Sequence, residues 1–126
     1  MEEDRIQASE THLFKVVFPP VTNHYDTLFG GATLQIMDEA AFIAATRYTR
    51  MRMVTVSSEK VEFKKAIPGG VMVEAIARVM QVGKTSLKVK VEIFMEEMYS
   101  QKRELVVDGI FSFVALDEDH NKVQIK

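Results

Sequence analysis

The fold depends on residues 30–48, GGATLQIMDEAAFIAATRY. This stretch predicts one long helix, roughly Ala32 to Tyr48, that begins directly after Gly30 and Gly31. Its apolar residues lie on most sides of a helical wheel, so we expect the helix to be buried rather than to lie on a surface. Its alanines allow close approach of neighbouring backbone. A helix of this kind is a core element around which the rest of the chain must fold.

The sequence on both sides of the helix predicts strands. The stretch from His12 to Phe18 reads as a short strand that ends at Pro19. Alternating apolar and polar residues then predict four long strands, at Met53–Phe63, Val71–Val82, Thr85–Glu96 and Leu105–Leu116. Short connections favour antiparallel pairing, and a sheet with one apolar face must cover that face. The predicted fold class is therefore α+β, with a curved antiparallel β-sheet wrapped around one long central helix. Its open edges favour dimerisation by strand pairing.

The composition is that of one domain, residues 1–126, in which the polar residues 1–10 are expected to be loose. Lys and Arg number 16 and Asp and Glu number 18, a balance that argues against a general nucleic-acid binder. The chain has no cysteine, and its three histidines are widely scattered, so we expect no disulfide, cysteine nucleophile or metal site. No signal peptide or membrane-spanning run is present in the sequence, which makes a cytoplasmic protein without membrane contact the expectation.

Asp38 is the polar residue that fits its helix least well. It lies at the edge of the apolar stripe, near Leu34 and Phe42, and aspartate is both a poor mid-helix residue and costly to bury without a partner. Two interpretations remain open. Asp38 is a partly desolvated carboxylate that serves as a general base or nucleophile, or the polar side of the helix is wider than expected and Asp38 faces water.

Three other features have two interpretations each. The backbone amide of Gly31, at the helix start, can bind negative charge or stabilise an oxyanion, or the Gly-Gly pair serves only the turn. The amide of Asn23 can orient water or a carbonyl group, or cap a turn. The segment Lys84–Ser86 can hold a phosphate or form a solvated hairpin.

Taken together, the order and spacing of several segments resemble hotdog-fold acyl-CoA thioesterases. The segments are Val16–Pro19, Thr22–Asn23, Leu28–Gly31, Ile36–Ala41, Val54–Ser57, Val61–Ile67, Gly83–Ser86 and Phe113–Asp117. The resemblance covers residues 13–117. It implies hydrolysis of an acyl-CoA to a free carboxylic acid and coenzyme A. No cofactor is then required, because coenzyme A is part of the substrate.

The resemblance also implies roles for individual residues. Asp38 matches the carboxylate that activates water or attacks the thioester, and Gly31 matches the helix-start glycine whose amide polarises the carbonyl. Asn23 matches an active-site asparagine that comes from the opposite protomer. The catalytic unit is then a homodimer, which in this family often assembles further into a hexamer, a trimer of dimers. The residues that match coenzyme A contacts are Val54, Thr55, Val56, Lys84, Thr85 and Ser86.

The sequence departs from the family pattern at three places, and two other functions remain as alternatives. Arginine is common in the family where Lys84 stands, and lysine keeps the charge without the planar fork. The family often has glycine where Tyr25 or Asp26 stands, and usually a bulky aromatic residue at Ile36. Asp26 would add a second carboxylate near the site. A non-catalytic acyl-CoA-binding module is one alternative, against which Asn23 and Asp38 argue. A hotdog hydratase or dehydratase is the other, but it normally uses an Asp–His pair that this chain lacks. The acyl chain length and the choice between base and nucleophile stay open.

Overall fold

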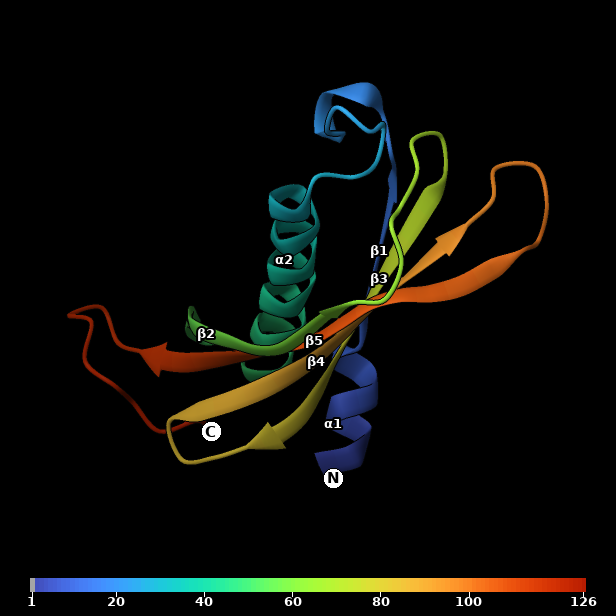
Figure 1. Cartoon of the computed structure of the whole chain (residues 1–126). Helices are drawn as coiled ribbons and strands as arrows, with labels where there is room; N and C mark the ends of the chain where they lie inside the picture. Colours follow the sequence, from blue (N-terminus) through green and yellow to red (C-terminus); the bar gives the residue numbers. More distant parts are fainter. Residues whose placement is uncertain (1) are drawn as a thin grey trace.

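The structure is a computed structural model that describes residues 2–126 (Figure 1). The elements in chain order are α1 (Glu2–Ser9), β1 (Thr11–Val16), the 3-10 helix η1 (Pro19–Val21), α2 (Gly30–Thr49), β2 (Arg52–Phe63), β3 (Met72–Val82), β4 (Ser86–Glu96) and β5 (Arg103–Leu116). The strands form one antiparallel sheet in the order β1-β3-β4-β5-β2. Helix α2 stands against one face of this curved sheet and touches all five strands. The predicted fold class is confirmed. Within residues 2–126, no helix is both long and apolar enough to span a membrane.

The inner face of the sheet is buried by alternate residues along β3 and β4. The side chains at alternate positions are buried, and these are Val73, Ala75, Ala77, Val79, Leu87, Val89, Val91 and Ile93. In β5 the alternation changes phase, because Ile93 pairs with Val107 whereas the next residue, Phe94, pairs with Leu105. Val106 is therefore the extra residue of a β-bulge, and both Val106 and Val107 are fully buried. The alternation along Leu105–Leu116 predicts that Leu105 points inward, but the bulge places it on the outer face beside Phe94.

Helix α2 is buried on one side only, which corrects the expectation of a helix enclosed all round. One side of the helix is fully buried in the core, at Met37, Ala40, Ala41, Ala44 and Ala45. On the other side, Leu34 is 38% exposed and Phe42 is 43% exposed. The sheet can cover only the side of the helix that faces it, and α1 reaches only the far end. The side of α2 away from the sheet is thus open in a single chain, with large apolar residues in contact with water.

Residues 1–10, for which the sequence predicted no element, contain helix α1. Ile6 joins the hydrophobic core, so α1 is attached by burial as well as by hydrogen bonds. The Nε of Arg5 donates to the carbonyl of Tyr48 over 2.8 Å, and the Nη2 of Arg47 donates to the carbonyl of Ala8 over 2.8 Å. Three acidic residues in the first turn favour a helix start, a signal that was present in the sequence.

A chain of alternating charges also fastens α1 to the outer face of the sheet. We call it the ionic chain; its members in order of contact are Glu3, Arg78, Glu10, His12, Glu74, Arg103 and Glu96. His12 is the middle member, with Nδ1 2.6 Å from Glu74 Oε2 and Nε2 2.9 Å from Glu10 Oε2. Because a neutral imidazole donates through only one nitrogen, the full ionic chain requires protonated His12.

We expect the ionic chain to make stability depend on pH. Hydrogen bonds to Glu74 and then Glu10 raise the pKa of His12 above its usual value of 6.5. The stabilisation is therefore complete below pH 6.5 and is lost as the pH rises through the higher folded-state pKa. Since the His12 side chain is 43% exposed, solvent screening limits the effect to at most about 1 kcal/mol.

Urea unfolding of wild type and of His12→Gln at about pH 6 and about pH 9 measures this effect. The wild type is expected to lose stability between the two pH values, and His12→Gln to lose less. His120→Gln is the matched control, because His120 is exposed and lies outside the ionic chain. An equal loss in wild type and His12→Gln would mean that His12 does not carry the pH dependence.

Gly109 in β5 is required for close packing between strands and helix. A Cβ at this position would lie 2.9 Å from Val61 Cγ2, 3.3 Å from Val61 Cα and 3.2 Å from Met37 Cε. We therefore expect Gly109→Ala to lower the free energy of unfolding by about 1–3 kcal/mol, as measured by urea denaturation. Gly30→Ala is the control, since a Cβ there meets nothing within 4 Å. Equal stability of the two variants would show that β2 has room to move away.

Candidate active site

Helix α2 begins without a cap. Phe29 occupies the N-cap position and no side chain caps the helix, whose first turn carries no acidic residue. The first helical hydrogen bond runs from the Thr33 amide to the Phe29 carbonyl over 2.9 Å. Within residues 2–126 the amides of Gly30, Gly31 and Ala32 have no hydrogen-bond acceptor. These free donors and the positive end of the helix dipole favour negative charge at this point.

Asp38 lies seven residues beyond Gly31 on the same helix, a rise of about 10 Å. It is half-buried, and its Oδ1 accepts a hydrogen bond of 2.8 Å from Thr55 Oγ1 in β2. None of the ion pairs formed by residues 2–126 includes Asp38. A neutral hydroxyl thus holds one oxygen of the carboxylate in place and leaves the other oxygen open to a ligand.

A β-bulge in β2 presents Thr55 to the helix. Thr55 pairs with Phe113, whereas Ser57 already pairs with Ser112, so Val56 is the extra residue. Bulges of this kind re-aim side chains next to functional sites. Thr55 was predicted as a coenzyme A contact; in the structure it lines the cavity beside α2 and its hydroxyl donates to Asp38.

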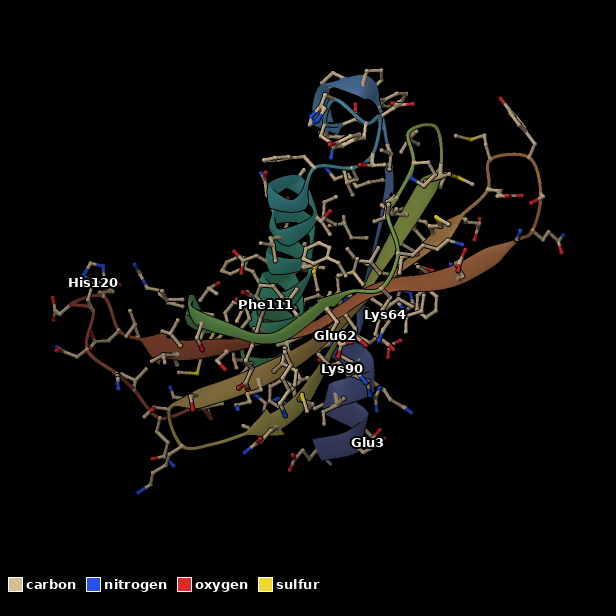
Figure 2. All side chains as sticks on the ribbon, in the orientation of Figure 1. Glu3, Glu62, Lys64, Lys90, Phe111 and His120 are labelled. Carbon is tan, nitrogen blue, oxygen red and sulfur yellow. The ribbon has the colours of Figure 1, made fainter. Side chains whose placement is uncertain are left out.

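A cavity of about 510 Å³ joins these groups, and we call it the α2–β2 cavity. It is lined by Gly31, Leu34, Gln35, Asp38, Thr55, Val56, Ser57, Ser58 and Phe111. Phe111, labelled in Figure 2, forms its buried wall. Gln35, Ser57 and Ser58 were not among the predicted site residues. Gln35 was detectable because it lies one helical turn before Asp38, but the serines follow a bulge that the sequence does not reveal.

Asn23 lies in the loop before α2, where its side-chain oxygen caps a turn. Asn23 Oδ1 accepts hydrogen bonds from the Tyr25 amide at 2.9 Å, the Thr27 amide at 3.2 Å and Thr27 Oγ1 at 3.0 Å. The amide nitrogen Nδ2 has no acceptor among residues 2–126 and remains a free donor. Asn23 does not line the α2–β2 cavity of its own chain.

Asp26 follows in the same loop and has a conformational role. Its φ of 58° lies in the left-handed region, which glycine adopts freely and aspartate tolerates. Its carbonyl accepts a hydrogen bond of 2.9 Å from the Gly69 amide, and its Oδ1 lies close to Gly69. Asp26 therefore faces the turn between β2 and β3 and, like Asn23, does not line the α2–β2 cavity of its own chain.

Lys84 and Thr85 lie in the turn between β3 and β4, and Ser86 begins β4. Ser86 pairs with Val114, and Val114 pairs with Val54. Ser86 and Val54 therefore lie level with each other on the outer face, with β5 between them. The structure thus brings the two predicted coenzyme A segments to the same end of the sheet, where Thr55 and Val56 line the α2–β2 cavity and Val54 and the residues 84–86 do not. Thr85 contributes its carbonyl to the Ala115 amide over 2.9 Å.

The described chain offers no metal-binding cluster. Among residues 2–126 no group of three or more His, Asp or Glu is arranged to hold a metal ion. The polar groups at the α2–β2 cavity are instead a carboxylate, hydroxyls, a carboxamide and free backbone amides. This set suits attack on a polarised carbonyl group.

Known proteins with similar sequences were found by comparison. A sequence model described as thioesterase superfamily matches residues 25–101. An uncharacterized acyl-CoA thioester hydrolase of Zymomonas mobilis is 31% identical over 118 residues, which cover 94% of this chain and 79% of that protein. The uncharacterized acyl-CoA thioester hydrolase YkhA of Bacillus subtilis is 37% identical over 109 residues, covering 86% of this chain and 63% of that protein.

Solved structures show the same likeness. The acyl-CoA hydrolase of Staphylococcus aureus in complex with butyryl coenzyme A and coenzyme A has a TM-score of 0.91 and 32% identity. The match covers 95% of this chain and 73% of that chain. Structures of that enzyme include variants in which an asparagine, an aspartate or a threonine is replaced by alanine. A hexameric broad-specificity acyl-coenzyme A thioesterase has a TM-score of 0.82 and 32% identity, covering 90% of this chain and 79% of that chain.

The chain therefore belongs to the thioesterase superfamily. Within that superfamily, its fold and its relatives assign it to the hotdog-fold acyl-CoA thioester hydrolases. The resemblance stated from the sequence is confirmed at both levels.

Proposed function

We propose that this protein hydrolyses acyl-CoA thioesters to a free carboxylic acid and coenzyme A. The observation that carries the proposal is that a free backbone donor and a carboxylate line the same cavity. The free amide of Gly31 and the Thr55-held carboxylate of Asp38 both line the α2–β2 cavity. A thioester bound between them has a donor for its carbonyl oxygen and a carboxylate for water.

The reaction by the general-base route uses water as the second substrate. Asp38 takes a proton from the water, whose oxygen bonds to the thioester carbon while the carbonyl oxygen becomes an oxyanion facing the Gly31 amide. The C–S bond then breaks, and the coenzyme A thiolate leaves and takes up the proton. In the nucleophilic route, a carboxylate oxygen of Asp38 attacks the thioester carbon, and the C–S bond breaks to release the coenzyme A thiolate. Water then hydrolyses the resulting anhydride to the free acid and the Asp38 carboxylate, and the thiolate takes up the proton released. The open carboxylate oxygen serves either route.

Asn23 completes the site from the partner protomer in this proposal. Its free Nδ2 donor suits a carbonyl oxygen or a water, and its position outside the α2–β2 cavity of its own chain supports a cross-protomer role. The asparagine, aspartate and threonine replaced in the Staphylococcus aureus enzyme are spaced as Asn23, Asp38 and Thr55 are here. The catalytic unit is a homodimer, and three dimers form a hexamer; a related thioesterase is hexameric.

The remaining assignments concern coenzyme A and location. Val54 and Val56 with Lys84, Thr85 and Ser86 contact the pantetheine and the phosphates, at the end of the sheet where both segments meet. No cofactor is needed beyond the substrate itself. We assign the chain, residues 1–126, to one thioesterase domain. We also propose that it acts in the cytoplasm, because a human relative that is 25% identical is named a cytosolic acyl coenzyme A thioester hydrolase.

The test is release of free thiol from a panel of acyl-CoAs by the purified protein. We expect turnover with at least one chain length, together with stoichiometric free acid. Tight binding of coenzyme A without thiol release would instead indicate a non-catalytic binding module. Hydration of enoyl-CoA without thiol release would indicate a hydratase.

A further inference from the structure

A second hollow lies on the other flank of α2, between the helix and β1, and we call it the α2–β1 groove. Its volume is about 570 Å³, within the range of small-molecule sites. It is lined by Phe14, Lys15, Val16, Val17, Phe18, Pro20, Val21, Leu28, Ala32, Gln35, Ile36, Glu39 and Val73. Phe14 is 60% exposed and Phe18 is 62% exposed at its rim. Large apolar side chains left in water around a hollow indicate a binding surface.

The α2–β1 groove meets the α2–β2 cavity at one residue. Gln35 lines both, and it lies on the side of α2 that faces away from the sheet. Figure 1 shows α2 standing between β1 and β2, so the two hollows flank the helix. Gln35 precedes Asp38 by three residues, which places their Cβ atoms about 5–6 Å apart. A chain that starts at Asp38 and crosses the stem of Gln35 therefore enters the groove.

Gln35 does not close this route. Its carboxamide makes no hydrogen bond to any of residues 2–126, and the side chain is exposed, so it can turn aside without losing a partner. Beyond it, the floor of the groove is buried and apolar, formed by Ile36 with Leu28 and Val73. The polar residues of the lining are only Lys15, Gln35 and Glu39.

We propose that the α2–β1 groove takes the hydrocarbon chain of the acyl group, so that the preferred substrates are acyl-CoAs with chains long enough to pass Gln35. This inference rests on the proposed function and adds the substrate class. The thioester lies at Asp38, and the chain, which can form no hydrogen bonds, leaves water for an apolar surface. Each methylene buried in the groove raises kcat/KM by at most about fourfold.

The experiment compares kcat/KM for acetyl-, butyryl-, octanoyl-, lauroyl- and palmitoyl-CoA in wild type and Ile36→Trp. Ile36 is 9% exposed on the groove floor, and an indole in its place fills the groove. We expect kcat/KM of wild type to rise with chain length. In Ile36→Trp it should fall at least about tenfold for lauroyl-CoA and stay within about twofold for acetyl-CoA. Ile43→Trp is the matched control, because Ile43 lies two turns further on the same helix and lines neither hollow.

A second variant keeps the test decisive if Ile36→Trp does not fold. Phe18→Ala removes an exposed apolar contact at the rim and leaves the core unchanged, so long-chain acyl-CoAs should lose affinity, with KM rising about threefold to tenfold. Phe63→Ala is its control, because Phe63 is 53% exposed and lines neither hollow. We expect Phe63→Ala to behave as wild type at every chain length.

Three outcomes would overturn the inference while leaving the thioesterase function intact. One is a wild-type rate that does not rise with chain length. Another is an equal loss on acetyl-CoA and lauroyl-CoA in Ile36→Trp. The third is a change of oligomeric state in Ile36→Trp and Phe18→Ala on gel filtration, which would make the groove an interface between copies of the chain. No hydrolysis at any chain length would overturn the proposed function itself.

Discussion

Asp38→Asn is expected to lower kcat by about 10³-fold, within the range of roughly 10²–10⁴ that general-base catalysis contributes. Asparagine has the shape of aspartate, and its Oδ1 can still accept the hydrogen bond from Thr55 Oγ1. What it loses is the ability to take a proton or to attack a carbonyl carbon. The measurement is steady-state thiol release from an acyl-CoA that the wild type hydrolyses.

The control for Asp38→Asn must separate chemistry from folding. Its urea unfolding midpoint should match that of wild type, since the substitution adds no volume and leaves the hydrogen bond in place. Asp119→Asn is the matched variant, because Asp119 is exposed in the turn after β5, far from α2 in sequence. Activity of Asp38→Asn close to that of wild type would leave the fold in place but remove Asp38 from the mechanism.

Mixing two inactive variants is expected to restore activity if Asn23 and Asp38 of one site come from different protomers. Asn23→Ala and Asp38→Asn are each expected to be nearly inactive as homodimers. In a heterodimer of the two, one site carries both substitutions and the other carries none. Random pairing of equal amounts should therefore recover roughly a quarter of wild-type activity, as two-fold symmetry requires.

The mixture is made by unfolding the two variants together in urea and refolding them by dilution. Wild type treated in the same way sets the upper limit, and each variant refolded alone sets the lower limit. Failure to recover activity in a mixture that contains heterodimers would place Asn23 and Asp38 in the same protomer, or remove Asn23 from the site. The hydrolytic function proposed for the chain would be unaffected by that result.

The architecture was predictable because it depends on periodicity. One apolar helix and strands that alternate cleanly, such as β4, leave few arrangements that bury both. The errors come from features without a periodic signal. The bulge at Val106 shifts the alternation of buried and exposed residues along β5. The exposed side of α2 follows from the size of the sheet, which no local sequence pattern encodes. Helix α1 was missed because its residues are mostly polar and only Ile6 and Ser9 are buried.

The candidate site was predictable only in part. Asp38 could be identified as a candidate on physical grounds, since a carboxylate in an apolar helix is costly to bury without a partner. Its partner Thr55 could not be assigned from the sequence. The two residues are far apart in the chain, and their contact depends on a β-bulge at Val56. Asn23 had the ordinary signals of a turn residue, and its oxygen does cap a turn. Only its likeness to a family pattern marked it as a site residue.

The uncapped start of α2 has a consequence for turnover as well as for the chemical step. Backbone donors that stabilise an oxyanion also attract a carboxylate, and the acid released by hydrolysis is a carboxylate. Since no acidic side chain stands in the first turn of α2 to repel it, the product competes with fresh substrate for the amides of Gly30 and Gly31. We therefore expect product inhibition by the free acid, strongest for the acyl chains that bind best. In the proposed reaction, the accumulating acid then occupies a growing share of the sites and raises the apparent KM for the acyl-CoA.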